Sequence, residues 1–244
     1  MSAIAIIGGT GMNQWPGLTI QRLQPVDTPY GETSAPLAYG RVHGTDVIFL
    51  PRHGEGHKIP PHLINYRANL RALKDAGVQS VIAISAVGGI AKSMKPAGVA
   101  VPDDVIDYTW GRAHTYWDGP GPMQHVDFSE PYAPRLRRAL LAGARKAAVR
   151  VVDGGVMGVT QGPRLESPAE IARMKRDGCA MVGMTGMPEA TLAAELELDY
   201  AALALSVNWA AGLGSGDIHG EIERTVADGM KKVRAILAKA LPAL

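Results

Sequence analysis

The chain contains a single cysteine, Cys179, among its 244 residues. One cysteine cannot form an internal disulfide bond, and because Cys179 belongs to no CxxC pair, the sequence also excludes a cysteine-based structural zinc site. We expect Cys179 to be a small, buried, hydrophobic side chain. The sequence also lacks a run of about 18 apolar residues and a basic segment followed by an apolar one at its start. These absences predict a cytoplasmic protein without a membrane span.

Strong charge and abundant aromatic side chains are missing as well. The formal net charge is +2, and aromatic residues make up 5% of the chain. The basic residues are dispersed, and the group Arg135, Arg137 and Arg138 is typical of a solvated helix face. With few rings on which bases can stack, the sequence does not favour nucleic-acid binding. Its hydrophobic content of 46% is enough for one large α/β domain spanning residues 1–244.

Short apolar runs alternate with helical patterns along the chain. We expect strands at residues 3–7, 46–50, 78–85, 155–160, 180–184 and 200–207. We expect helices at 65–76, 134–148, 168–177, 189–196 and 222–237, the third introduced by a capping box from Ser167 to Glu170. Residues 96–121 show little periodicity, which indicates irregular structure. The alternation predicts a largely parallel or mixed sheet with helices on both faces.

The first predicted strand ends in a glycine-rich turn, Gly8-Gly9-Thr10-Gly11. Glycine lets the backbone approach an oxyanion closely, so this turn can offer N–H groups to a phosphate. A dinucleotide-binding oxidoreductase is an alternative with the same opening. Its fingerprint requires a third glycine where this chain has Gln14. A phosphate-binding turn is therefore favoured.

Polar side chains recur where the predicted strands end. They are Thr10, Arg52, His53, Ser85, Thr185 and Asn208. Open α/β sheets bind ligands at the carboxyl ends of their strands, so one site can collect all of these residues. The guanidinium of Arg52 can bind an oxyanion bidentately, and the hydroxyls add further donors. HExxH and GxSxG motifs are absent. A site rich in anion donors and poor in nucleophiles suits a reaction in which the bound anion is the nucleophile.

Short segments in order along nearly the whole chain carry a family resemblance. They are Gly8-Gly9-Thr10-Gly11, Pro51-Arg52-His53-Gly54, Asn65-Tyr66-Arg67-Ala68-Asn69, Gln161-Gly162-Pro163-Arg164 and Gly183-Met184-Thr185-Gly186-Met187-Pro188-Glu189. Together they resemble the methylthioadenosine phosphorylase branch of the purine nucleoside phosphorylases. The resemblance implies a phosphorylase-type α/β fold, a single domain with a central mixed β-sheet flanked by helices, and a homotrimer. It also implies that inorganic phosphate is a co-substrate and that neither a metal nor an organic cofactor is needed.

The resemblance also suggests site residues. It implies a phosphate site made of Thr10, Arg52, His53, Ser85, Ala86 and Thr185. It implies substrate contacts from Met184 at the ribose, Leu165 at the purine face, His57 near the 5' group, and His125 contributed by a neighbouring subunit, with Asn208, Trp209 and Ala210 at the base. Asn208, Arg52 and His53 are the candidate catalytic residues. Ile218 and Ile222 are candidates for an apolar wall around the 5' group, although core packing is the favoured role of Ile222.

The sequence departs from the family pattern at one place. Methylthioadenosine phosphorylases have Asp-x-Asp where this chain has Asn208-Trp209-Ala210. An aspartate accepts a hydrogen bond from the 6-amino group of adenine, whereas Asn208 can donate to O6 or N7 of a 6-oxopurine. A mismatched buried polar group costs roughly 1–3 kcal/mol, enough to reverse a preference between the bases.

Loss of both carboxylates resembles the methylthioinosine phosphorylase members of the family. This predicts phosphate-dependent cleavage of S-methyl-5'-thioinosine to hypoxanthine and 5-methylthioribose 1-phosphate in purine salvage. The alternatives are a methylthioadenosine phosphorylase, a broader purine nucleoside phosphorylase, a dinucleotide-binding oxidoreductase, or a nucleoside-binding protein without turnover. The sequence pattern assigns no acceptor to the purine N1–H.

Overall fold

A computed structural model describes residues 3–12, 15–119, 125–214 and 218–244, so Gln14 lies outside the described residues. The strands are β1 (Ala3–Gly8), β2 (Thr19–Gln24), β3 (Asp27–Thr28), β4 (Gly31–Glu32), β5 (Leu37–Val42), β6 (Thr45–Pro51), β7 (Val78–Gly89), β8 (Val99–Val101), β9 (Asp104–Tyr108), β10 (Val152–Asp153), β11 (Val156–Thr160), β12 (Cys179–Gly183) and β13 (Asp199–Trp209). The helices are α1 (Tyr66–Asp75), α2 (Pro134–Lys146), α3 (Pro168–Arg176), α4 (Glu189–Glu195) and α5 (Ile218–Ala240), with short 3-10 helices η1 (Glu55–His57), η2 (Pro61–Leu63) and η3 (Leu241–Ala243).

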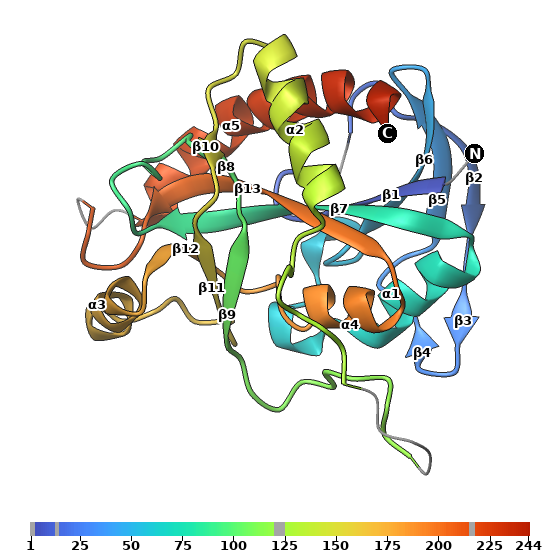
Figure 1. The fold of residues 1–244 in the computed structure, drawn as a ribbon, viewed down its shortest axis with the longest axis horizontal. Helices are drawn as coiled ribbons and strands as arrows, with labels where there is room; N and C mark the ends of the chain where they lie inside the picture. The colour runs from blue at the N-terminus through green and yellow to red at the C-terminus, as the bar shows by residue number, and fades with distance from the viewer. Residues whose placement is uncertain (1–2, 13–14, 120–124, 215–217) are drawn as a thin grey trace.

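A mixed sheet runs through the centre of the molecule (Figure 1). Its main path follows the order β10-β8-β13-β7-β1-β6-β5-β2. β7 pairs in parallel with both β1 and β13. A second branch of β9, β11 and β12 joins this path through an antiparallel pair, in which Gly88 and Gly89 of β7 face Val182 and Met181 of β12. The long strand β7 therefore connects the two branches.

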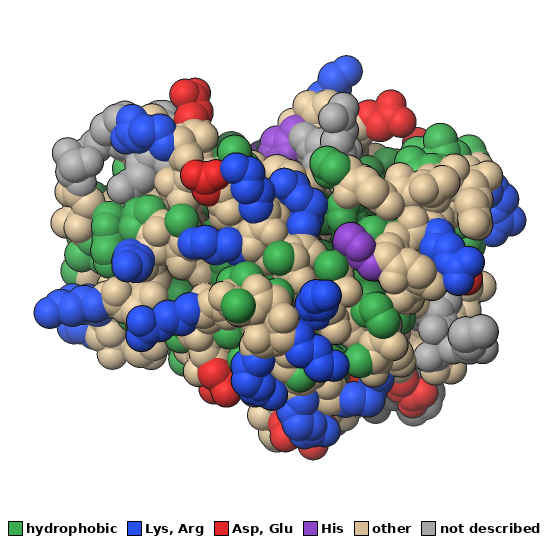
Figure 2. Space-filling view, turned by 90° about the horizontal axis from the view of Figure 1, so that it is seen from above, with side chains coloured by type: hydrophobic (Ala, Val, Ile, Leu, Met, Phe, Trp, Pro, Cys, Tyr) green, Lys and Arg blue, Asp and Glu red, His purple; other side chains and the backbone are tan. Residues whose placement is uncertain are grey.

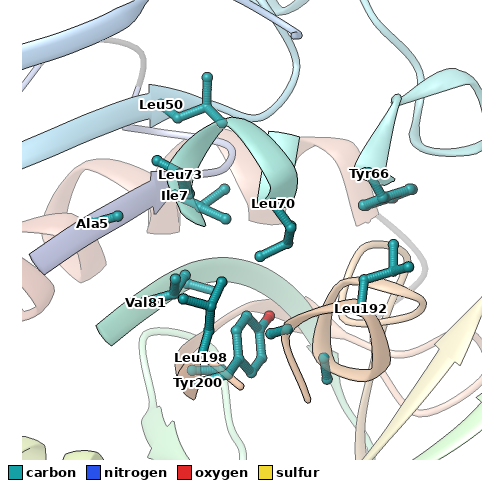
Figure 3. Close-up of a cluster of buried hydrophobic side chains, with 14 of the residues drawn as sticks. Ala5, Ile7, Leu50, Tyr66, Leu70, Leu73, Val81, Leu192, Leu198 and Tyr200 are labelled. Atoms are coloured by element: carbon teal, nitrogen blue, oxygen red, sulfur yellow. The ribbon is translucent and has the colours of Figure 1, made fainter. Parts of the chain in front are cut away.

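Helices cover both faces of the sheet. α2 and α5 pack against each other over β13 on one face, and α1 and α4 lie together on the opposite face (Figure 1). Successive residues of β1 alternate between the two cores: Ile4 and Ile6 face one, Ala5 and Ile7 the other. Because both faces are covered, the strand is apolar throughout its length. Figure 3 shows the core on the α1 and α4 side, where side chains of these helices gather with those of the strands.

The surface and helix ends agree with most of the sequence expectations. Lys and Arg side chains are spread among apolar and uncharged ones on the face seen in Figure 2. The Ser167 hydroxyl and the Glu170 carboxylate form the expected capping box at the start of α3, and Cys179 is buried. Arg137 differs from the expectation of a solvated residue: it is half-buried and donates to the carbonyls of Val101 and Pro102. No helix in the described ranges is long and apolar enough to cross a membrane.

Some elements differ from the sequence prediction. Residues 96–121 are not irregular throughout, because they contain β8 and β9. Strands of three and five residues interrupted by proline and aspartate give too short a pattern for periodicity to reveal. β7 and β13 also extend beyond the predicted ends, so that Asn208 lies within a strand rather than in the loop after it.

Candidate active site

A cavity of about 420 Å³ lies at the carboxyl ends of β1, β6, β7, β12 and β13. Most of the residues predicted for the site line it, and they come from segments far apart in the sequence. These lining residues are Thr10, Arg52, His53, His57, Ala86, Leu165, Met184, Thr185, Asn208 and Ala210. The position agrees with the rule that open α/β sheets bind ligands beyond the carboxyl ends of their strands.

The turn after β1 lies close to β7. A Cβ atom on Gly9 would be 2.6 Å from the carbonyl oxygen of Ile84 and 2.9 Å from Nη1 of Arg52, so only glycine permits this approach. Ser85 is not among the residues that line the cavity, but it lies next to Ala86, which does. The buried Ser85 Oγ makes no hydrogen bond within the described part of the chain. A buried hydroxyl of this kind is rare in folded proteins, which makes Ser85 a candidate donor to a ligand.

The guanidinium of Arg52 is fully buried, and its fork is directed at a carboxylate of the protein. Nε donates to Glu189 Oε2 over 2.7 Å and Nη2 to Glu189 Oε1 over 2.8 Å, while Nη1 donates to the carbonyl of Ile84 over 2.9 Å. The hypothesis of a bidentate Arg52–phosphate contact is therefore wrong for the Nε–Nη2 edge, because Glu189 binds there. Burial alone would lower the pKa of Arg52, but the charge of Glu189, the hydrogen bonds to it and the nearby Tyr200 and Tyr66 together raise the pKa above its ordinary value.

Two histidine rings lie together at the side of the cavity. The ring centroids of His53 and His57 are 4.1 Å apart, and Nδ1 of His53 is 2.8 Å from the carbonyl oxygen of Ile59. Because a carbonyl only accepts, Nδ1 carries the proton and Nε2 of neutral His53 is an acceptor. Burial, followed by the charge of Arg52, lowers the pKa of His53 to about 4. Burial also lowers the pKa of His57, so both rings are neutral near pH 7.

Asn208 lines the cavity at an irregularity of β13. Ser206 pairs with Val87 and Asn208 with Gly88, so Val207 is an additional residue in the ladder. Such a bulge changes the direction in which the following side chain points. Both Val207 and Asn208 consequently line the cavity. Nδ2 of Asn208 donates to the carbonyl of Trp209 over 2.6 Å, which orients the amide and leaves its second N–H for another acceptor.

A carboxylate also lines the cavity. Glu166 lines it beside Leu165, in the segment between β11 and α3. The hydroxyl of Thr160 donates to Glu166 Oε1 over 2.6 Å, which fixes one carboxylate oxygen and leaves the other as an acceptor. The lining of the cavity therefore includes both an amide donor and a carboxylate acceptor.

Two of the predicted substrate residues do not line the cavity. Trp209 is half-buried, and its side chain packs near Gly214, where a Cβ atom would lie 2.9 Å from Trp209 Cβ. His125 is exposed and follows residues 120–124, which are outside the described part of the chain. Ile218 and Ile222 both line the cavity, and Ile222 also packs against the core on the α5 side. Among the described residues, no group of His, Cys, Asp and Glu side chains is arranged to hold a metal ion.

The sequence matches the phosphorylase superfamily over residues 3–242. The chain belongs to this superfamily. It is 51% identical over 245 residues to a probable S-methyl-5'-thioinosine phosphorylase of Pseudomonas syringae pv. tomato, with 100% of each chain covered. It is 41% identical to the 6-oxopurine nucleoside phosphorylase of Pyrococcus furiosus, covering 99% of this chain and 93% of the relative. A solved methylthioadenosine phosphorylase from an antarctic soil metagenomic library is similar with a TM-score of 0.92 and 32% identity, covering 99% of this chain and 86% of that one.

Membership of the phosphorylase superfamily confirms the resemblance and the fold class predicted from the sequence. Sequence reasoning nevertheless missed two residues of this phosphorylase. Glu166 lies two residues after a segment that carried the resemblance, and its acidic side chain beside Leu165 was an available signal. Glu189 ends another matched segment, but nothing in the sequence connects it with Arg52, which lies 137 residues away.

Proposed function

We propose that this phosphorylase cleaves S-methyl-5'-thioinosine with inorganic phosphate, giving hypoxanthine and 5-methylthioribose 1-phosphate. The observation that carries the proposal is that Glu166 and Asn208, a carboxylate acceptor and an amide donor, both line the cavity. The relatives named as probable S-methyl-5'-thioinosine phosphorylases, about half identical over nearly the whole chain, support the same substrate. The relatives named as 6-oxopurine nucleoside phosphorylases support the same class of base.

Hydrogen-bond complementarity explains why this pair favours hypoxanthine over adenine. A 6-oxopurine has a donor at N1–H and acceptors at O6 and N7, which match the Glu166 carboxylate and the Asn208 N–H. Adenine has an acceptor at N1 and a donor at its 6-amino group. With adenine, the Glu166 carboxylate would face a lone pair, and each buried mismatch of this kind costs about 1–3 kcal/mol. Ala210 adds no further polar group at this end.

The proposed reaction is a displacement at the anomeric carbon. An oxygen of phosphate forms a bond to C1' while the bond from C1' to N9 breaks, and the electrons of that bond pass into the purine ring. Asn208 donates to N7 or O6 and so stabilises the charge on the leaving base. Holding phosphate and nucleoside in line can supply up to about 7–11 kcal/mol of the barrier of a bimolecular reaction.

The phosphate is proposed to bind where the turn after β1 approaches β7 and β12. Thr10, Ser85 and Thr185 supply hydroxyl donors there, and the backbone at Ala86 lies beside them. His53 contributes Nε2, which accepts a hydrogen bond from a protonated phosphate oxygen while the ring is neutral. Arg52 contributes through its charge and through the Ile84 carbonyl that it holds.

The 5' methylthio group is proposed to lie against His57, Ile218 and Ile222, which provide an apolar wall. Met184 is proposed to contact the ribose. We further propose a homotrimer in which His125 of a neighbouring subunit completes the 5' end, in agreement with its exposed position outside the cavity of its own chain.

A substrate comparison tests the proposal. S-methyl-5'-thioinosine, S-methyl-5'-thioadenosine, inosine and adenosine are incubated with the enzyme with and without phosphate, and released base is measured by chromatography. The expected result is hypoxanthine from S-methyl-5'-thioinosine only when phosphate is present. Preference for S-methyl-5'-thioadenosine would contradict the role of Glu166 and Asn208, equal use of inosine would contradict the role of the apolar wall, and no phosphate-dependent cleavage would refute the proposed reaction.

A further inference from the structure

Arg112 is a buried cation outside the cavity, in the segment between β9 and α2. Arginine has five N–H donors in a fixed planar fork, and here the fork makes contacts on every side. Nε donates to the side-chain oxygen of Gln161 over 3.0 Å, and Nη2 to the carbonyls of Gln161 and Thr160 over 2.8 and 3.2 Å. Nη1 donates to the carbonyl of Met187 and, over 3.2 Å, to the hydroxyl of Tyr66. All five N–H groups of the guanidinium therefore have acceptors.

The acceptors of Arg112 belong to three separate segments, and each segment leads to a wall of the cavity. Thr160 and Gln161 begin the segment that carries Leu165 and Glu166 to the base end. Met187 follows Met184 and Thr185, which line the ribose and phosphate end. The hydroxyl of Tyr66 in turn donates to the carbonyl of Pro61 over 2.9 Å, and Pro61 lines the cavity beside the histidines. A single side chain thus joins walls that the sequence separates widely.

The environment of Arg112 is costly for a cation. Within the described residues its hydrogen-bond acceptors are all uncharged, and no salt bridge joins it to a carboxylate. Burial lowers the pKa of Arg112 below its ordinary value, which reflects the same cost. Burying a charge without an opposite charge is unfavourable unless carbonyl dipoles and hydrogen bonds compensate for the lost water. An apolar side chain would fill the space at lower cost but would leave the carbonyls of Thr160, Gln161 and Met187 without this donor.

We infer that Arg112 is a positioning residue that fixes the base wall and the phosphate wall of the cavity relative to each other. The inference rests on the proposed function, since it states what the two walls bind. Misplacing reacting groups by about 1 Å can cost a factor of 10² in rate, so a residue that sets this spacing affects both substrates. Because Arg112 itself does not line the cavity, its effect is transmitted through the segments that it holds.

The variant Arg112→Lys tests this role, since lysine keeps the charge but has only three donors on a single nitrogen. Arg137→Lys is the matched control, because Arg137 also donates to backbone carbonyls, those of Val101 and Pro102, but at residues that do not line the cavity. We expect Arg112→Lys to raise KM for both the nucleoside and phosphate and to lower kcat/KM by about 10- to 100-fold. We expect Arg137→Lys to leave both KM values unchanged. A lower melting temperature of Arg112→Lys with unchanged KM values would overturn the inference.

A milder variant covers the case in which Arg112→Lys does not fold. Gln161→Leu removes the side-chain oxygen that accepts from Nε of Arg112 and, over 3.3 Å, from the backbone N–H of Trp110, and it leaves the other four N–H groups of Arg112 with their acceptors. We expect it to raise KM for the nucleoside severalfold and to leave KM for phosphate unchanged. An equal change of both KM values, or of neither, would contradict the assignment of Gln161 and Arg112 to the base wall.

Amide hydrogen exchange separates this inference from the proposed function. If the native enzyme cleaves none of the nucleosides, the proposed function fails, but the positioning role still predicts faster exchange in residues 160–166 and 184–188 together in Arg112→Lys and not in Arg137→Lys. Unchanged exchange in either segment would overturn the inference whatever the substrate.

Discussion

The buried pair of Arg52 and Glu189 gives the sharpest prediction about this protein. Both side chains are fully buried, two hydrogen bonds of 2.7 and 2.8 Å join them, and the hydroxyl of Tyr200 donates to the same carboxylate over 2.8 Å. The variant Glu189→Gln keeps the shape of the side chain but removes its charge. The Arg52 cation would then be buried without a counter-charge, and the new amide N–H₂ would face the guanidinium N–H groups. We therefore expect Glu189→Gln to be strongly destabilising.

The structure sets the expected magnitude. Removing one partner of a fully buried ion pair costs about 3–5 kcal/mol of unfolding free energy. For a chain of this size, each kcal/mol lowers the melting temperature by about 2–4 °C, so the expected fall is about 6–20 °C. Tyr200→Phe is the matched control, because it removes one donor to the same carboxylate and leaves the ion pair intact. A hydrogen bond to a charged group contributes about 1.5–3 kcal/mol, so its effect is smaller.

The free energy of unfolding in urea and the melting temperature are measured for both variants. A loss of unfolding free energy in Glu189→Gln no larger than that in Tyr200→Phe would refute the view that Glu189 compensates the charge of Arg52.

A double variant, Arg52→Met/Glu189→Leu, separates the effect on stability from the effect on phosphate binding. Replacing a whole buried pair by apolar side chains is often neutral or stabilising, so this variant should be more stable than Glu189→Gln. It should still bind phosphate poorly, because the Ile84 carbonyl has lost the Nη1 donor and the cavity has lost the charge of Arg52.

The remaining predictions concern the base, the phosphate and the histidines. Asn208→Asp combined with Glu166→Gln should invert the preference between S-methyl-5'-thioinosine and S-methyl-5'-thioadenosine, each mismatch contributing about 5- to 150-fold to the ratio of kcat/KM values; an unchanged ratio would contradict base recognition by this pair. Ser85→Ala should raise KM for phosphate about fivefold at unchanged nucleoside KM, as initial rates would reveal. Because burial and Arg52 hold the pKa of His53 near 4, the unfolded chain binds more protons between pH 6.5 and 4, and stability should fall as the pH falls through this range. His53→Gln should flatten that dependence of melting temperature on pH, and an equally steep curve would exclude His53 as its source.

The strand ends were predictable because their signals are local. An apolar run followed by glycine and a polar side chain indicates where a strand stops. This pattern predicted that Thr10, His53 and Thr185 lie at the same edge of the sheet, and all three line the cavity there. Asn208 was predicted at the same edge, but the bulge at Val207 that directs it into the cavity leaves no mark in the sequence. Backbone pairing of this kind depends on the neighbouring strand β7, which periodicity within one segment cannot represent.

Long-range partners explain the other differences. Arg52 has the side chain expected of an anion-binding residue, and its engagement by Glu189 depends on α4 folding over the end of β6, 137 residues away. Arg112 lay in a segment that showed no period, and its function as a connector depends on acceptors from α1, β11 and the segment before α4. Residue type identified these side chains as polar candidates, but only the fold determines which acceptor each one meets.

The proposed recognition of the base depends on both branches of the sheet. Asn208 belongs to β13 in the main path, whereas Glu166 follows β11 in the second branch, and the antiparallel contact between β12 and β7 joins the two. A change at Asn208 alone alters the donor to O6 or N7 but leaves the Glu166 carboxylate facing N1, where adenine presents a lone pair. In the proposed reaction, discrimination between the two bases therefore depends on the relative placement of two segments rather than on one motif. Arg112 donates to the carbonyls of Thr160 and Gln161, which begin the segment that carries Glu166. Under the same proposal, we therefore expect Arg112 to affect the choice between the two bases as well as the rate.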